Sequence, residues 1–173
     1  DNDKEDITVD PDPDPKDPND PKDLASKGAT VTEGDTAEFK VSLTESSKDQ
    51  TVTITLTGAT AEKGKDFLNP SETQDIVIKY ADGTSVTVSP NTDGTYSVNV
   101  PAGETNFVVE VKTFDDVTIE NTEDYTLTVK VGNAEKTVSG TILDNDKPEA
   151  EITPKDPKDP DPKVPTDPKD PTK

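Results

Sequence analysis

Acidic residues gather at four places in this sequence, in loops or at the ends of predicted strands. The stretches are VTEGD at 31–35, AEKGKDF at 61–67, VKTFDDVTIENTEDY at 111–125 and GTILDND at 140–146. The third is the densest, because it has five acids within ten residues. These carboxylates can act together only if the fold brings the four stretches to one place.

Carboxylates that meet without a basic partner repel one another and resist joint ionisation. A divalent cation removes this conflict, and Ca²⁺ accepts six to eight oxygen ligands at about 2.3–2.6 Å. Mg²⁺ is less suited to an all-protein cage, and zinc prefers nitrogen or sulfur ligands. The doublet Asp115-Asp116 with Glu120, and the Asp-x-Asp at 144–146, favour a calcium site. The alternative is that the acids bind nothing and only keep an acidic surface soluble.

Other kinds of site chemistry have little support in the composition. Cysteine and histidine are absent, so thiolate and imidazole nucleophiles, bases and metal ligands are excluded. Serine is not found in a Gly-x-Ser-x-Gly elbow. Paired acids could hydrolyse glycosides, but the chain has no tryptophan to stack on a sugar. We therefore expect no enzymatic activity.

The charge of the chain restricts its partners. The formal net charge is −20 and the sequence pI is about 4.1. Such a protein is repelled by nucleic acid and by anionic membrane surfaces, and it attracts cations. No apolar run is long enough to cross a bilayer, so we expect no direct membrane insertion.

Proline divides the chain into three parts. Five of the 16 prolines lie in residues 11–21 and eight in 148–171, within Pro-Asp-Lys tracts that have no apolar face. Such tracts are expected to be extended and solvated. The sequence therefore predicts a domain over 24–147, with linkers at 1–23 and 148–173. The motif Asp-Asn-Asp-Lys occurs at 1–4 and again at 144–147, each time followed closely by Ile-Thr. This repetition indicates one unit of a tandem array, in which residues 1–3 end the preceding repeat.

Between the tracts, apolar residues alternate with polar ones almost everywhere. Runs with this period begin near Ala37, Val52, Ile76, Val86, Tyr96, Phe107, Tyr125 and Val138. The pattern is typical of half-buried strands, and Asp-Gly and Gly-Asn pairs mark tight turns between them. Seven to nine short strands at this spacing predict an all-β, antiparallel, immunoglobulin-like β-sandwich, with a barrel as the alternative.

The acidic stretches, in this order and together with VPAGETNF before the third, resemble a Calx-β repeat over about Ala29 to Asp146. The resemblance implies an immunoglobulin-like sandwich that binds Ca²⁺ at one end through loop carboxylates. Carried over by position, the implied ligands are Glu33, Asp66, Asp115, Asp116, Glu120, Asp144 and Asp146, and also Glu123. Asn145 stands where some members of the family have a carboxylate.

One departure from the compact repeat is the long stretch at 71–100, which reads as an added or lengthened hairpin. In this respect the chain resembles repeats of large bacterial surface adhesins of the repeats-in-toxin type. The expected function is a calcium-stiffened spacer repeat, extracellular at the bacterial cell surface, that supports adhesion or biofilm formation. Its expected partners are neighbouring repeats of the same chain, with host or biofilm surfaces contacted by other domains. The alternative is a module that itself binds a glycan, a protein or another copy, with Tyr80 and Tyr96 as possible contact residues.

Overall fold

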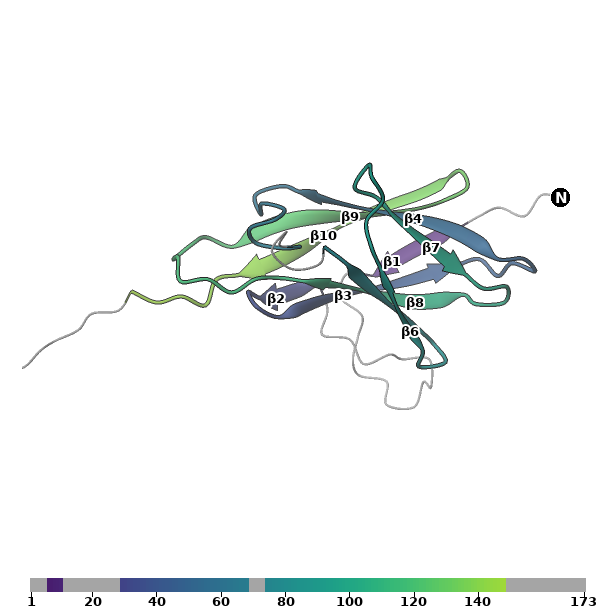
Figure 1. Ribbon diagram of the computed structural model, residues 1–173, viewed down its shortest axis with the longest axis horizontal. Coiled ribbons are helices and arrows are strands. Elements are labelled where there is room, and N and C mark those ends of the chain that lie inside the picture. Colours follow the sequence, from purple (N-terminus) through teal and green to yellow (C-terminus); the bar gives the residue numbers. More distant parts are fainter. Residues whose placement is uncertain (1–5, 11–28, 69–73, 149–173) are drawn as a thin grey trace, which may run out of the picture.

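The computed structural model describes residues 6–10, 29–68 and 74–148, and these form a sandwich of two five-stranded sheets (Figure 1). The strands are β1 (Ile7–Asp10), β2 (Thr30–Thr32), β3 (Thr36–Leu43), β4 (Gln50–Gly58), β5 (Ile76–Tyr80), β6 (Ser85–Val88), β7 (Tyr96–Val100), β8 (Asn106–Lys112), β9 (Glu123–Val131) and β10 (Ala134–Leu143). No helix is present in the part of the chain that the structure describes, nor therefore one that could cross a membrane. The predicted sandwich is confirmed.

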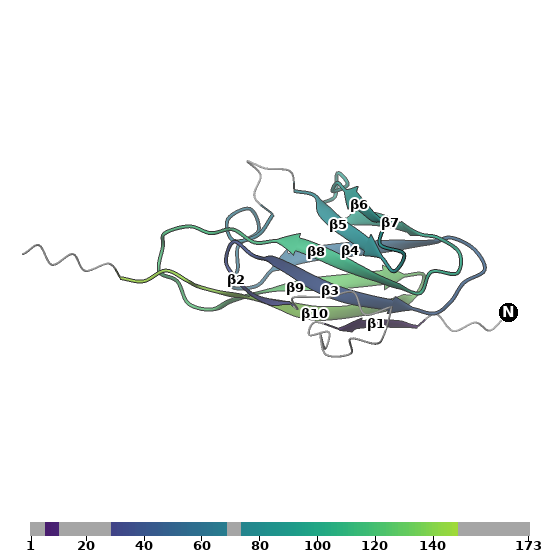
Figure 2. The same cartoon turned by 90° about the horizontal axis from the view of Figure 1, so that it is seen from below.

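One sheet has the strand order β1-β3-β8-β5-β6 and the other β2-β10-β9-β4-β7. Figure 2 looks onto one sheet with the other behind it, and most strands run along the long axis of the molecule. All pairs are antiparallel except β2 with β10, which is parallel. We call the end where β2, β8 and β10 finish the acidic pole. The opposite end, where β3, β7 and β9 finish, is the far pole.

The alternating positions fill the space between the sheets. Strands β3, β4, β5, β7, β8 and β9 bury the apolar residues that the period predicts. Strand β6 is the exception, because it is an edge strand and its Val86 is 47% exposed. Burial of this apolar area is the main favourable term that holds the two sheets together.

An aromatic stack lies between the core and the acidic pole. The rings of Phe67 and Tyr125 are stacked with centroids 4.6 Å apart, and Phe39 meets Tyr125 edge-on. Gly140 on β10 gives Tyr125 its room, since a Cβ there would lie 2.5 Å from the ring. The stack fixes the residue that follows Asp66, and so it anchors one of the acidic loops.

The added stretch forms two different features. Strands β5 and β6 make a hairpin in one sheet, with Gly83 at a φ of 86° in its turn. The second turn, at Asn91–Thr95, does not close a hairpin, because β6 and β7 belong to different sheets. Its Gly94 also has a positive φ, of 81°. The turn residues were predicted correctly, but the second turn carries the chain across the sandwich.

The predicted boundary at residue 24 is corrected by strand β1. Ile7–Asp10 pairs antiparallel with β3, and the side chains of Ile7 and Val9 are buried in the shared core. Without β1, strand β3 would have an unpaired edge. Strand β1 pairs with that edge and adds two apolar side chains to the core, so it belongs to this sandwich. Residues 11–28 therefore join two strands of one sandwich. The expected extended tails at 11–23 and 149–173, and the assignment of residues 1–3 to a preceding repeat, concern residues outside those described.

We predict that Val9→Ala lowers the free energy of unfolding by about 1–3 kcal/mol, because it removes buried methyl groups from the core. Thr8→Ala is the matched control, since Thr8 lies on the same strand with its side chain exposed. It should change stability by no more than about 0.5 kcal/mol. Urea unfolding followed by circular dichroism measures both. Equal stabilities would show that β1 is not part of the cooperative fold.

Candidate metal centre

The four acidic stretches meet at the acidic pole. Glu33 follows β2, Asp144 and Asp146 follow β10, and the loop between β8 and β9 carries Asp115, Asp116 and Glu120. Glu123 is the first residue of β9, and Asp66 lies in the segment after β4. Each acidic segment follows a strand that ends at this pole or precedes a strand that begins there. The alternating strand directions therefore bring the four segments to one end of the sandwich. The sequence alone predicted this convergence.

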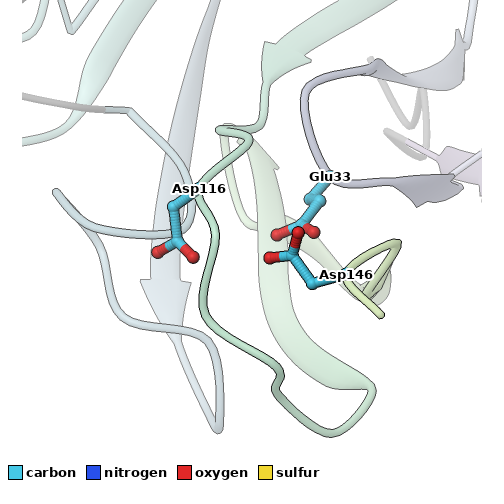
Figure 3. A group of neighbouring side chains, drawn as sticks. All are labelled: Glu33, Asp116 and Asp146. Atoms are coloured by element: carbon cyan, nitrogen blue, oxygen red, sulfur yellow. The ribbon is translucent and has the colours of Figure 1, made fainter. Parts of the chain in front are cut away.

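Within the described part of the chain, two groups of three acids are close enough to hold a metal ion. In the first, the Glu33 cluster, ligand oxygens of Glu33, Asp116 and Asp146 all lie within 4.8 Å of one another. Figure 3 shows the carboxylates of Glu33 and Asp146 facing each other, with Asp116 opposite them on the β8–β9 loop. Oxygen Oδ2 of Asp146 is buried and has no hydrogen-bond partner. An orphaned carboxylate oxygen among other carboxylates fits a hard cation with oxygen ligands.

Main-chain hydrogen bonds hold the Glu33 cluster in place. The Glu33 amide donates to the carbonyl of Leu143 (2.9 Å), which ties its loop to the end of β10. The amide of Asn145 donates to Glu33 Oε1 (3.0 Å). Both carboxylate oxygens of Asp144 accept amide protons, from Asp146 (2.9 Å) and Glu120 (3.0 Å). Asp144 therefore organises the turn and lies outside both groups of three.

Asp115 also lies outside the two groups. Its Oδ1 accepts a hydrogen bond from the side-chain amide of Asn145 (2.9 Å), and that amide also donates to the carbonyl of Glu33 (3.4 Å). Gly34 makes room for this arrangement, because a Cβ at Gly34 would lie 2.9 Å from the Asp115 Cβ. Its φ of 82° favours glycine in any case. Asn145 thus serves as a hydrogen-bond donor that positions acids from two other loops.

The second group, the Asp66 cluster, contains Asp66, Glu120 and Glu123, again with ligand oxygens within 4.8 Å. Asp66 Oδ2 accepts the amide of Glu62 (2.6 Å), which closes a tight loop in which Gly64 has a φ of 93°. Lys65 reaches into this cluster, where its Nζ lies 3.4 Å from Asp66 Oδ1 and pairs with Glu120. Sequence alone does not indicate that Lys65 is part of a site, because nothing in its spacing distinguishes it from other surface lysines.

Glu33 of the first cluster and the whole Asp66 cluster border one small cavity of about 10 Å³, with room for about one water-sized sphere. Its acidic lining residues are Glu33, Asp144, Asp66, Glu120 and Glu123. The clusters are therefore neighbouring parts of a single acidic centre.

The crowding of carboxylates perturbs their protonation. Burial, reinforced by the charge of Asp66, raises the pKa of Glu123 to about 7. Burial also raises the pKa of Glu33 and of Asp146, and the charge of Asp144 acts in the same direction on both. The pKa of Asp144 is lowered, chiefly because the Asp146 amide stabilises its charged form. The centre thus contains ionised and proton-retaining acids side by side, which is what a site lacking enough positive charge produces.

Tyr80 and Tyr96 do not form an exposed aromatic patch. Both rings are buried, and their hydroxyls donate to the carbonyls of Asn99 (2.8 Å) and Gln74 (2.6 Å) respectively. These two tyrosines therefore stabilise the core and its rim.

Comparison with known proteins assigns no family. No protein-family model matches the chain, and no curated protein matches it. One similar solved structure is the apo form of the Calx CBD1 domain, which is 19% identical in sequence and has a TM-score of 0.46. The match covers 68% of this chain and 89% of that domain. A second is the calcium binding domain CBD12 of CALX1.1, with 18% sequence identity and a TM-score of 0.45. The match covers 68% of this chain and 41% of that one. A third is the N-terminal domain of the Streptococcus gordonii adhesin Sgo0707, with 11% sequence identity and a TM-score of 0.39. The match covers 82% of this chain and 32% of that one. At these values the likenesses carry no ligand or activity over to this chain.

We predict that the metal-free protein loses stability as the pH rises from about 4.5 to about 7. The pKa of Glu123 is about 7 in the fold against 4.5 for an unperturbed glutamate. In this window the folded state keeps a proton that the unfolded state has released, so the free energy of unfolding falls with rising pH. Melting temperatures in EGTA at pH 5.5 and pH 8 measure the effect.

Glu123→Gln should reduce this pH dependence, because the amide resembles the protonated acid and does not titrate. Glu135→Gln, an exposed acid on β10 near the far pole, is the matched control and should leave the slope unchanged. A slope that Glu123→Gln does not alter contradicts the assignment.

Proposed function

We propose that this chain is a calcium-binding structural repeat of a secreted or cell-surface bacterial adhesin, a spacer stiffened by Ca²⁺ at its acidic pole. The observation that carries the proposal is the convergence of Glu33, Asp116 and Asp146 around a carboxylate oxygen that has no partner. The adhesin role rests on the motif resemblance and on the Pro-rich tracts. Its setting is extracellular, where calcium is plentiful, and its partners are neighbouring repeats.

The donor set fits Ca²⁺ because every candidate ligand is an oxygen. The Glu33 cluster and the Asp66 cluster together offer six carboxylates, and Asp115 and Asp144 lie beside them. A bound Ca²⁺ would supply the positive charge that allows these acids to ionise together. Glu33, Asp116 and Asp146 are the first residues that we assign to hold it, and Asp66, Glu120 and Glu123 are those of an adjoining site.

Stiffening follows from linkage between binding and folding. The ligands come from loops that are joined only in the folded sandwich, so Ca²⁺ binds the native state and not the unfolded chain. A ligand at a hundred times its Kd stabilises the native state by about 2.7 kcal/mol. Extracellular modules bind calcium at about 0.1–1 mM. The loops of the acidic pole are therefore held together where calcium is abundant and loosened where it is removed.

We predict that saturating Ca²⁺ raises the melting temperature by about 10 °C relative to EGTA, on the basis of this linkage and the usual entropy of unfolding of a domain of this size. Asp146→Asn should remove most of the increase, because it takes a charge from the oxygen that lacks a partner. Differential scanning calorimetry provides the measurement. Glu135→Gln changes the charge equally, away from the site, and should keep the full calcium response. A melting temperature that calcium leaves unchanged in the parent protein would refute the proposal.

We also predict that Lys65→Gln increases calcium affinity several-fold, because the lysine ammonium neutralises Asp66 and Glu120 in competition with a bound cation. The control is Lys79→Gln. This lysine lies on β5, away from the acidic centre, and pairs with Glu38 on β3 (3.7 Å) and with Glu110 on β8. Isothermal titration calorimetry gives the Kd of each variant. If both variants bind with the parental Kd, Lys65 does not compete with the metal.

A further inference from the structure

The acidic pole carries exposed apolar side chains as well as acids. Val117 is 91% exposed, Ile119 55% and Leu143 39%, the first two on the β8–β9 loop and the third at the end of β10. Among the described residues these are three of the four large hydrophobic side chains classed as exposed, and the fourth is Val86 on β6. Single exposed apolar residues are ordinary, but a gathering of them at one place marks an interaction surface. We call Val117, Ile119 and Leu143 the pole patch.

The far pole has a surface built from two loops that are hydrogen-bonded to each other. Gly103 donates to the carbonyl of Ser46 (2.9 Å), and the amide of Ala102 donates to Asp49 Oδ1 (3.0 Å). These bonds join the β7–β8 turn to the β3–β4 loop. The turn presents Pro101, Ala102 and Gly103 to solvent. We call this surface the far platform.

The start of β1 is fixed to the same platform. The amide of Thr44 donates to the carbonyl of Asp6 (3.1 Å), and the Asp6 amide donates to the Thr44 hydroxyl (3.1 Å). The chain therefore enters the sandwich at the far pole. It leaves at the acidic pole, after β10, through Asp144–Asp146 (Figure 1).

The repeated motif connects these two ends. At 144–147 the motif Asp-Asn-Asp-Lys supplies acids of the acidic centre, and its other copy at 1–4 stands two residues before β1. From Asp3 to Ile7 are four steps along the chain, which span at most about 14 Å. Four residues separate the motif at 144–147 from the Ile-Thr pair at 152–153, against two residues after the first motif, so that connection is only two residues longer. A Pro-Asp-Lys tract used as a spacer could instead separate two sandwiches by about 60 Å.

From these observations we propose that the far platform of one copy docks directly on the pole patch of the copy before it. The partner is a second copy of this sandwich, joined through the few residues between Asp-Asn-Asp-Lys and β1. The segment 11–28, which contains the first Pro-Asp-Lys tract, then connects β1 to β2 within one sandwich, and the matching tract after 153 has the same place in the next copy. This inference rests on the proposed role as a repeat, and it replaces the spacer role that the sequence suggested for the tracts.

A tandem protein tests the joint. In this tandem, residues 1–146 of the first copy are followed directly by residues 4–173 of the second. The joint then has the same sequence as the first motif and the residues after it, and each copy retains all ten strands. The chain has no cysteine, so Glu135→Cys in each copy provides two exposed sites for nitroxide labels. Double electron–electron resonance in calcium should give one narrow distance distribution. A matched tandem with twelve Gly-Ser residues inserted at the joint should give a distribution several times broader. Equal breadth in the two tandems would overturn the proposal.

The pole patch is tested in the same tandem. Val117→Ser with Ile119→Ser in the first copy should broaden the distribution towards that of the Gly-Ser control, because it removes the apolar contact. Val86→Ser, which changes an exposed valine on β6 outside the pole patch, should leave it narrow. The single chain with Val117→Ser and Ile119→Ser should keep its melting temperature, which excludes a folding defect. A distribution that both variants leave narrow would refute the patch as the contact.

Calcium calorimetry on the single chain separates this inference from the proposed function. If the single chain binds calcium and the direct tandem is as broad as its Gly-Ser control, only the docking inference fails. If the single chain binds no calcium and the tandem is narrow, the docking inference stands and the calcium role fails.

Discussion

The mutual repulsion of carboxylates at one pole is the constraint on which the rest of this structure depends. Strand ends and loops from four parts of the chain deliver acids to one small region, and the sandwich must hold them there against their charge. It does so with main-chain amides, with Asn145 and with Lys65. Each of these donors contributes part of the positive charge that the acids need. None of them contacts Oδ2 of Asp146.

The hydrophobic core and the acidic centre are mechanically coupled through a few residues. Asp66 is followed by Phe67, which stacks on Tyr125, and Tyr125 packs against the bare backbone of Gly140. Gly140 lies on β10, the strand that ends at Leu143, directly before Asp144. The positions of two acidic segments are thus set by one aromatic contact in the core. The burial of Phe67 and Tyr125 stabilises the fold and also fixes the geometry of the candidate site.

Much of the fold could be predicted from the sequence, because alternation of apolar residues reports strands directly and glycine turns separate them. Strand β1 could not, since two apolar residues between acids and prolines are too few to show a period. Its place is decided by the open edge of β3, which is a tertiary property. The convergence of acids followed from strand direction. Which oxygens actually meet depended on loop conformation, so Asp115 and Asp144 bind neighbouring amides while Asp116 and Glu123 join the clusters.

The antiparallel pairing of β1 with β3 determines how this sandwich responds to tension. A pull transmitted along the chain enters at Ile7, at one end of the molecule, and leaves after Leu143, at the other. It acts along β1, so the hydrogen bonds between β1 and β3 are sheared together and cannot be unzipped one by one. The load then crosses from one sheet to the other through the buried side chains of Ile7 and Val9, and the core itself becomes the element that bears the force.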